Sequence, residues 1–458
     1  MATGKGSGFK KRGGRRHNSR SGQHESRAVE QEAPVVRQQL SRIGLIVVAC
    51  IGVFFLYLGW NIVADTRAFR LALSEPELAI EWNKREALAL DLLAERDLAS
   101  PDGKLDDARG WAERALVANP LDARAISLLG QIAEKNGDHE RADRLMRLAG
   151  DRTWHDNSTQ SWLFDRHVRR GEFSQALPHI DAVLRSNLDL QNQLFPVVAS
   201  FTVKPPAFSA LTEFLETSPP WRTWFLSELS ARLANRARLI ELFNALKSSA
   251  RPPTNEELQA YINRLVNDGS FDIAYQTWRE TLPAATRANV SVPYNKDFVL
   301  AVDRMPFNWV FTQVAGADIQ IVPSPDGGKT RVLRVEFSGA RLNFANVRQV
   351  VLLPPGEYVF LGKVKTERLA GPRGLWWNIL CAGNSPQSIA RTELAIGTAP
   401  WTDFSINFTV PSAGCKAQIL QLELPARIPS ERLLEGQVWY QQLQILSSQD
   451  GAKIPKTN

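Results

Sequence analysis

Histidine is scarce in this chain and absent from its C-terminal half. The six histidines all lie at or before His179, and two of them, His17 and His24, belong to the first 42 residues. Histidine-assisted serine or cysteine catalysis and histidine-ligated zinc are therefore excluded from the region that follows. The four histidines from His139 to His179 lack a short metal-binding spacing such as HExxH, so we expect no metal site among them.

Excess charge of either sign is absent from most of the chain. The formal net charge is +7, but residues 1–42 contain ten Lys or Arg and three Glu, so the remaining residues carry 45 of each sign. The basic isoelectric point therefore comes from one tail and does not indicate nucleic-acid binding by the folded part. Residues 1–42 also have too few apolar side chains to form a core, which predicts a disordered basic tail.

One long apolar run follows the tail directly. Residues 43–60 form a stretch of 18 residues without a charge, and the run continues to Ala64. A helix of this length reaches across a hydrocarbon layer of about 30 Å, so we predict a transmembrane helix at 43–64. A cleavable signal peptide is the alternative, with Ala64 before the cleavage site, but its apolar core is usually only about 7–15 residues long.

The basic tail before the apolar span predicts on which side of the membrane each part lies, and the number of cysteines is consistent with this prediction. Arg and Lys are in excess before the span, so the tail should be cytoplasmic and the chain after residue 64 should lie outside. We expect a single-pass protein in contact with lipid of the inner membrane, with most of the chain in the periplasm. Cys50 lies in the span, and the only later cysteines are Cys381 and Cys415. An even number in an oxidising compartment predicts a disulfide between them, the alternative being two buried free thiols.

A glycine and an alanine recur with a period of 34 residues after the span. The copies are GKLDDA from Gly103, GDHERA from Gly137 and GEFSQA from Gly171, and GSFDIA from Gly269 is a later echo. This period is typical of stacked helical hairpins, in which glycine permits the tight turn and alanine lies where the helices approach closely. The register is lost between residues 200 and 260, where either degenerate repeats or a differently packed helical cap would fit.

This pattern resembles the tetratricopeptide repeat family over about residues 70–285. The resemblance implies an α-solenoid over residues 65–285, in which the first helix of each pair lines a groove that holds a peptide or protein partner. Six residues of the second and third repeats would face that groove by this resemblance: Arg124, Ser127, Gln131, Lys135, Arg166 and Arg170.

Residues 286–448 have a different character, and a short tail follows at 449–458. Short β-rich runs alternate with turn residues such as Pro-Pro-Gly, without helical segments between them, which predicts an antiparallel β-sandwich. The fold class is therefore α followed by all-β, with one transmembrane helix, a solenoid and a C-terminal sandwich. The predicted strands are 331–337, 349–353, 358–365, 375–381, 404–410, 418–424 and 437–446.

The order of motifs in this region resembles the jelly-roll carbohydrate-binding modules, over about residues 288–448. The motifs are NKDF at 295–298, FNW at 307–309, LPPGEY at 353–358, Trp401 with Phe404, and GQVWY at 436–440. The resemblance implies a jelly roll that binds a glycan. Such modules often hold a structural calcium with acidic side chains where this chain has Val299, Gln441 and Gln442, so we predict no metal.

Tryptophan could give this region a ligand surface. Flat indole rings stack on sugar faces while nearby amides bind hydroxyls, but sandwich cores also use tryptophan. We therefore expect about three of five to lie in the core, the five being Trp309, Trp376, Trp377, Trp401 and Trp439.

Strand alternation selects a predicted glycan site. In the strand 418–424 every second residue is leucine, which leaves Gln421 and Glu423 on the opposite face. If the disulfide crosses that opposite face, Trp377 joins them, and with its neighbour Trp376 these residues form the predicted site. A bulge in either strand would reverse this assignment.

Together these features predict a membrane-anchored, non-catalytic envelope scaffold without a cofactor. Its helical repeats would hold an inner-membrane or periplasmic protein partner and its sandwich a glycan, which suits the assembly or export of a surface polysaccharide. One alternative is a pure protein-interaction scaffold, for which both Trp376 and Trp377 should be buried. The other is a divergent glycan-active enzyme, which requires two acidic side chains about 5–10 Å apart in a cleft.

Overall fold

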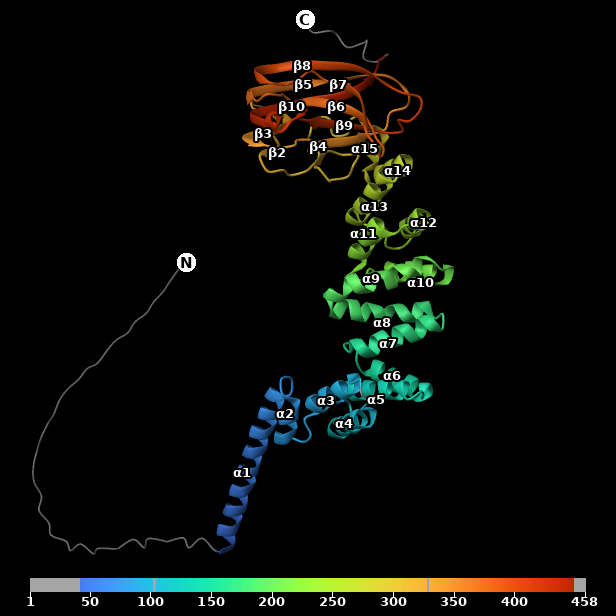
Figure 1. Ribbon diagram of the computed structural model, residues 1–458, viewed down its shortest axis with the longest axis vertical. Helices are drawn as coiled ribbons and strands as arrows, with labels where there is room; N and C mark the ends of the chain where they lie inside the picture. The colour runs from blue at the N-terminus through green and yellow to red at the C-terminus, as the bar shows by residue number, and fades with distance from the viewer. Residues whose placement is uncertain (1–41, 102–103, 328, 449–458) are drawn as a thin grey trace, which may run out of the picture. The chain divides into compact units, whose positions relative to one another are not determined.

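The computed structural model describes residues 42–101, 104–327 and 329–448 (Figure 1). The predicted N-terminal and C-terminal tails and Gly103 of the first repeat lie outside these ranges. The chain divides into two units, residues 1–89 and residues 90–458, which are described separately below.

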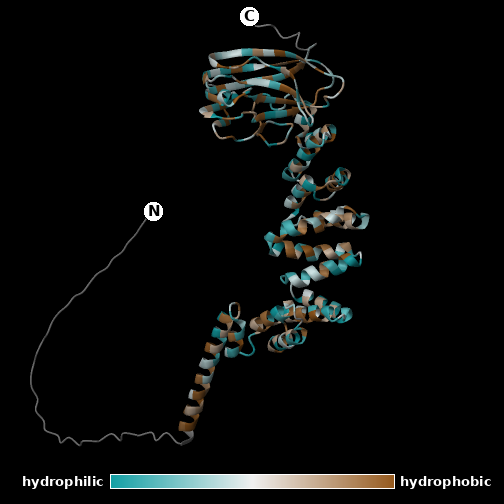
Figure 2. Cartoon of the chain, in the orientation of Figure 1, coloured by the Kyte–Doolittle hydropathy of each residue, from teal (hydrophilic) through white to brown (hydrophobic). Residues whose placement is uncertain are grey.

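The first unit contains the long apolar helix that the sequence predicts. Helix α1 (Arg42–Leu71) is long and apolar enough over Leu45–Leu71 to cross a membrane, and the side chains of its most apolar 18-residue window are not buried. Figure 2 shows much of this helix in brown, the colour of hydrophobic residues. The short helix α2 (Pro76–Trp82) packs against its C-terminal end, where Ala72 and Ala79 are fully buried and the Arg67 guanidinium lies 4.7 Å from the Trp82 ring centre.

The second unit begins with a series of helices, here called the helical arm (residues 90–288). Neighbouring helices such as α5 and α6, or α7 and α8, pack as hairpins. The helices are α3 (Ala87–Ala99), α4 (Leu105–Ala118), α5 (Ala123–Lys135), α6 (His139–Arg152), α7 (Asn157–Arg169), α8 (Phe173–Ser186), α9 (Gln191–Ala199), α10 (Pro205–Glu216), α11 (Arg222–Arg232), α12 (Arg236–Lys247), α13 (Asn255–Asn267), α14 (Phe271–Thr281) and α15 (Ala284–Ala288).

The repeated glycines and alanines have the structural roles that their spacing predicts. The glycines at the turns adopt the left-handed backbone conformation, with φ of +77° at Gly137, +76° at Gly171 and +73° at Gly269. Each alanine of the pattern is fully buried between helices, namely Ala108, Ala142, Ala176 and Ala274. From residue 191 to residue 254 the hairpin turns lack glycine, and the core there is built from aromatic side chains such as Phe195, Trp221 and Phe225.

Asp91 of α3 is an ionisable group in the core of the arm, and it makes stability depend on pH. Its side chain is 2% exposed, and its Oδ1 has no hydrogen-bond partner within residues 42–101, 104–327 and 329–448. Burial raises the pKa of Asp91 to about 7, and the neighbouring carboxylate of Asp122 adds to this effect. The folded state therefore disfavours the ionised carboxylate. The free energy of unfolding is highest below the ordinary pKa of 3.8, and the contribution of Asp91 is lost as pH rises from there through about 7.

We expect Asp91→Asn to stabilise the chain by about 2 kcal/mol near pH 8 and to have little effect near pH 4. Asparagine has a similar shape but cannot ionise, so the variant should lose the decline in stability over this range. Urea unfolding at several pH values measures this difference. Asp107→Asn, at an exposed position of α4, is the matched control. An Asp91 variant whose stability declines with pH as the parent's does would contradict the expectation.

The C-terminal part of the second unit is a β-sandwich of two antiparallel five-stranded sheets in the described chain (Figure 1). One sheet has the order β1-β4-β9-β6-β7 and the other β2-β3-β10-β5-β8. The strands are β1 (Val310–Phe311), β2 (Ala317–Pro323), β3 (Arg331–Arg341), β4 (Val347–Val351), β5 (Gly356–Ala370), β6 (Trp376–Cys381), β7 (Gln387–Arg391), β8 (Gly397–Val410), β9 (Gln418–Glu423) and β10 (Leu433–Ser447). All seven predicted strands are present, while β1, β2 and β7 are additional.

The core of the sandwich contains the predicted disulfide. Cys381, the last residue of β6, bonds to Cys415, which lies in the turn before β9. Both cysteines are buried among the apolar side chains between the two sheets. The sequence predicts that about three of the five tryptophans lie in the core, and this number is confirmed. Trp309, Trp377 and Trp439 are buried, whereas Trp376 and Trp401 are partly exposed.

The helical arm and the sandwich share one apolar core. The ring centre of Trp278 on α14 lies 5.5 Å from that of Phe307 and 5.0 Å from that of Tyr294, both at the start of the sandwich. The same cluster extends to Val350 on the outer face of β4. The Nε2 amide of Gln259 also donates a hydrogen bond of 3.2 Å to the backbone oxygen of Arg304. Side-chain packing therefore joins the two parts directly.

Candidate functional site

The polar residues predicted for the glycan site meet on the outer face of one sheet. The register pairs Trp376 with Glu423 and Asn378 with Gln421 across β6 and β9. The Trp376 indole and the Asn378 amide each donate a hydrogen bond of 2.8 Å to one carboxylate oxygen of Glu423, and Gln421 donates one of 2.9 Å to the other. The structure thus brings Trp376, Gln421 and Glu423 together around a single carboxylate.

Trp377 does not lie on this face, and its predicted role as an exposed platform is wrong. Its side chain is 1% exposed and faces the core, because the register pairs Trp377 with Leu422. The prediction counted alternation from Cys415, but Cys415 precedes the first residue of β9 and lies outside the regular strand. The disulfide consequently lies on the inner face, and the tryptophan four residues before Cys381 faces inward with it.

Trp376 is not a free stacking platform either. Its indole N–H already binds Glu423, and the guanidinium of Arg391 covers the ring at 4.9 Å from its centre. Arg391 is held in turn by a 2.9 Å hydrogen bond from its Nε to Ser388 Oγ. The polar groups of this cluster satisfy one another, which leaves few of them available to a ligand.

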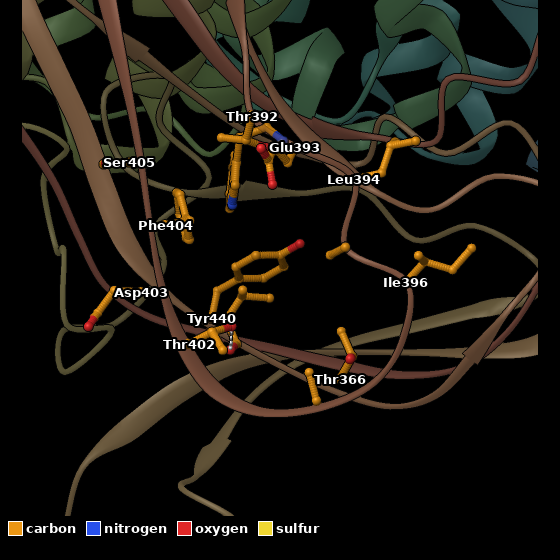
Figure 3. Close-up of a pocket in the computed structure, with 14 residues that line it drawn as sticks. Thr366, Thr392, Glu393, Leu394, Ile396, Thr402, Asp403, Phe404, Ser405 and Tyr440 are labelled. Carbon is orange, nitrogen blue, oxygen red and sulfur yellow. Dashed lines mark hydrogen bonds between the residues drawn. The ribbon is translucent and has the colours of Figure 1, made fainter. Parts of the chain in front are cut away.

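A cavity of about 470 Å³ lies at one edge of the sandwich and is called the edge pocket here (Figure 3). Strands β7 and β8 end the two sheets at this edge, but β8 has 14 residues and β7 only five. Part of the inner face of β8, including Phe404, is therefore only half-buried. The pocket is lined by Val364, Thr366, Trp377, Thr392, Glu393, Leu394, Ala395, Ile396, Ala399, Thr402, Asp403, Phe404, Ser405 and Tyr440.

Three buried polar side chains line the edge pocket. The indole N–H of Trp377 and the hydroxyl of Thr366 are buried without a hydrogen-bond partner among the described residues. The hydroxyl of Tyr440 points into the cavity (Figure 3), and burial raises the pKa of Tyr440 far above its usual range, which keeps the hydroxyl protonated. Because buried polar groups in folded proteins are almost always hydrogen-bonded, the Trp377 N–H and the Thr366 hydroxyl could bind a polar ligand or an ordered water.

The wall formed by residues 392–396 is fixed to β6. Trp377 donates its backbone N–H to Thr392 Oγ1 at 2.9 Å, and Leu375 and Ala395 exchange two backbone hydrogen bonds of 3.0 and 2.7 Å. Gly374 permits this close approach, since a Cβ there would lie 2.3 Å from the Ala395 oxygen. A preformed wall reduces the entropy lost when a ligand binds.

Strand irregularities shape the opposite wall. The pairing between β5 and β8 shifts near Thr366, which lies opposite Ala399 while Val364 lies opposite Thr402. Such a bulge redirects side chains next to it. Phe404 lies opposite Gly362, where a Cβ would come within 2.9 Å of the ring, so glycine gives the ring its place in the wall.

The rim of the edge pocket is apolar and acidic. Leu394 and Ile396 are 39% and 47% exposed there. Asp403 pairs with Lys363 at 3.1 Å, and its carboxylate points away from the cavity, whereas the carboxylate of Glu393 points into it (Figure 3). Neither acidic residue was predicted for the site, and neither was Thr366, Phe404 or Tyr440. Tyr440 ends the GQVWY motif and Phe404 belongs to the motif with Trp401, but neither motif indicated a ligand site.

The described residues offer no cluster of three or more His, Cys, Asp or Glu side chains that could hold a metal ion. Val299, Gln441 and Gln442 are the positions at which the sequence analysis considered calcium ligands. None of the three supplies a carboxylate, so they do not fit a calcium ion.

The cationic residues predicted for the helical groove bind neighbouring parts of the arm. Arg124 pairs with Glu95, and Lys135 donates a hydrogen bond of 2.6 Å to the Leu98 backbone oxygen. Arg166 and Arg170 both pair with one carboxylate oxygen of the buried Asp143, at 3.2 and 3.5 Å, and lower its pKa together with Arg147 against the opposing effect of burial. These charges thus join neighbouring helices.

Ser127 is a further correction among the predicted groove residues. Its side chain is 1% exposed, and its hydroxyl donates a hydrogen bond of 3.8 Å to the Met146 sulfur between α5 and α6. The amide of Gln131 donates to Ser127 at 3.4 Å. Ser127 is inaccessible because the α5–α6 contact closes over it.

No protein-family model and no curated protein matches this chain. Solved structures similar to the C-terminal β-sandwich include a CBM4 carbohydrate-binding module, with a TM-score of 0.27 and 14% identity over 34% of this chain and 99% of that one. Another is the CBM22-1 xylan-binding domain of Xyn10C from Paenibacillus barcinonensis, with a TM-score of 0.22 and 12% identity over 30% and 85%. A third is a carbohydrate-binding module, CBM6cm-2, of lichenase 5A from Cellvibrio mixtus in complex with cellotriose, with a TM-score of 0.18 and 13% identity over 30% and 98%.

Proposed function

We propose that the sandwich binds a glycan in the edge pocket, as part of a non-catalytic scaffold anchored in the inner membrane by α1. The observation that carries the proposal is the set of buried polar groups at the pocket, two of which lack partners. Sugar hydroxyls both donate and accept hydrogen bonds, so one ring could serve the Trp377 N–H, the Thr366 hydroxyl and the Tyr440 hydroxyl. The Phe404 ring and aliphatic neighbours suit the apolar face of a sugar, and the volume falls within the usual range of about 300–1,000 Å³ for ligand pockets.

The acidic residues of the edge pocket support binding rather than hydrolysis. A glycosidase acid works with a raised pKa in apolar surroundings, and a second carboxylate must face it across the bond that breaks. Glu393 is exposed, and Asp403 points away from the cavity and pairs with Lys363. We therefore infer a binding module.

The membrane part of the proposal rests on α1 and the sequence before it. The helix carries no charge from Leu45 to Ala64, and residues 1–42 have a net charge of +7, which favours a cytoplasmic N-terminus and a periplasmic sandwich. For a protein partner of the helical arm the support is Trp154, which is 51% exposed beside a cavity of about 380 Å³ lined by Pro178 and Ala182. A scaffold that presents a glycan to a partner suits the handling of a surface polysaccharide.

Thr366→Val is expected to weaken glycan binding about tenfold and to leave stability unchanged or raise it by about 1 kcal/mol. Valine keeps the shape of the side chain but removes a hydroxyl that has no partner in the part of the chain that the structure describes. Isothermal titration of the full chain in nanodiscs against a panel of bacterial envelope oligosaccharides measures the affinity, and urea unfolding measures the stability.

Thr409→Val is the matched control, because Thr409 is an exposed threonine of β8 and does not line the pocket. It should bind the same oligosaccharides as the parent. Absence of binding to every oligosaccharide, or equal binding by parent and Thr366→Val, would contradict a glycan site in the edge pocket.

A further inference from the structure

We propose that the edge pocket prefers a saccharide that carries a protonated amino group, with an uncharged saccharide next and a uronate last. This inference rests on the proposed function and names the ligand class of the same pocket. It follows from the charges of the lining residues and from the direction in which their side chains point.

The lining of the edge pocket contains acidic residues but no Lys or Arg. Asp403 is already paired with Lys363 and turns away from the cavity. Glu393 forms no ion pair with another described residue, and its carboxylate points toward the same space as the Tyr440 hydroxyl (Figure 3). A ligand in the pocket would therefore meet one carboxylate that no cation neutralises.

The remaining polar groups cannot compensate an acidic ligand. The N–H of Trp377 and the hydroxyls of Thr366 and Tyr440 are neutral donors in surroundings that also contain Phe404 and Leu394. A uronate carboxylate bound here would lose its hydration without forming an ion pair with a cation. It would also be repelled by the carboxylate of Glu393. An ammonium group would instead gain a charge-assisted hydrogen bond to Glu393.

The test compares matched oligosaccharides that differ only in charge. The probes are glucose, glucosamine and glucuronate oligomers of one linkage and length, together with the corresponding galactose series. Each is titrated into the full chain in zwitterionic nanodiscs at a pH of about 6, where amines are protonated and carboxyl groups are ionised. Titrations at low and high salt show whether the differences are electrostatic.

We expect the amino oligomer of the preferred series to bind about tenfold more tightly than its neutral counterpart, and the uronate to bind most weakly. Glu393→Gln should reduce the gap between amino and neutral sugars to about threefold or less. Glu357→Gln is the matched control, because Glu357 is exposed on β5 and does not line the pocket, and it should preserve the order.

The outcomes separate this inference from the proposed function. Neutral oligomers that bind as tightly as amino oligomers, or uronates that bind best, would overturn the charge preference and leave glycan binding standing. A preference that survives Glu393→Gln unchanged would also overturn it. If no oligomer of either series binds, the charge preference and the glycan site fail together.

Discussion

Replacing Arg222 with methionine is expected to lower the free energy of unfolding of the helical arm by about 3–5 kcal/mol, because it leaves a carboxylate buried without its cation. Arg222 and Glu257 join α11 to α13, and their side chains are only 5% and 2% exposed. The Arg222 Nε and a Glu257 carboxylate oxygen lie 3.1 Å apart. The Glu257 carboxylate is therefore shielded from bulk water.

The contacts around the pair explain why the loss should be large. The guanidinium also donates to the backbone oxygens of Leu215 at 3.0 Å and Arg251 at 3.1 Å. Glu257 accepts the backbone N–H of Thr254 at 2.9 Å, which completes the capping box at the start of α13. Removing one partner thus leaves several buried polar groups unsatisfied.

Urea unfolding followed by far-ultraviolet circular dichroism measures the effect in the full chain. The double variant Arg222→Met with Glu257→Leu should recover part of the stability, since it removes both charges together. Arg238→Met, which disrupts a more exposed pair with Glu241 at 2.7 Å, should lower stability by no more than about 1 kcal/mol. An Arg222 variant as mild as this control would refute the assignment of a buried ion pair.

Removing the disulfide is expected to destabilise the sandwich by about 3–4 kcal/mol. Cys381 and Cys415 are separated by 34 residues, so the bond restricts a sizeable loop of the unfolded chain. The paired change Cys381→Ser with Cys415→Ser tests this, since both sulfurs are then replaced together. Cys50→Ser, at the exposed free cysteine of α1, should leave stability unchanged.

Unfolding followed by near-ultraviolet circular dichroism, with and without a thiol reductant, reports on the aromatic cores of the arm and the sandwich, and a loss caused by the reductant belongs to the sandwich because the disulfide lies there. Reductant should lower the stability of the parent toward that of the paired variant and should not affect the variant itself. A parent chain that resists unfolding equally with and without the disulfide would contradict the expected contribution of the bond.

The sequence predicts most elements of this fold because their signals are local. Turn glycines and buried alanines mark the hairpins, and β-branched or aromatic runs mark seven strands. Strand β7 (Gln387–Arg391) has a polar sequence, QSIAR, and is short, so it carries no such signal. Its shortness is nevertheless what leaves the edge pocket open.

The candidate site is less predictable because it depends on strand register and on irregular pairing. Trp376 and Trp377 are neighbours, and a single position decides which of them faces the core. Cys415 lies just outside β9, so counting along the sequence assigned the wrong tryptophan to the surface. The bulge beside Thr366 is likewise set by contacts between β5 and β8 that neither strand reveals alone.

The shared core at Trp278 has a mechanical consequence. A flexible linker would let a captured polymer swing freely, but here the rings of Trp278, Phe307 and Tyr294 interlock. A force on a polymer bound to the sandwich would therefore act on the last hairpin of the arm through side-chain contacts. Under the proposed function, the sandwich would therefore transmit tension, as well as occupancy, to helix α14 of the arm.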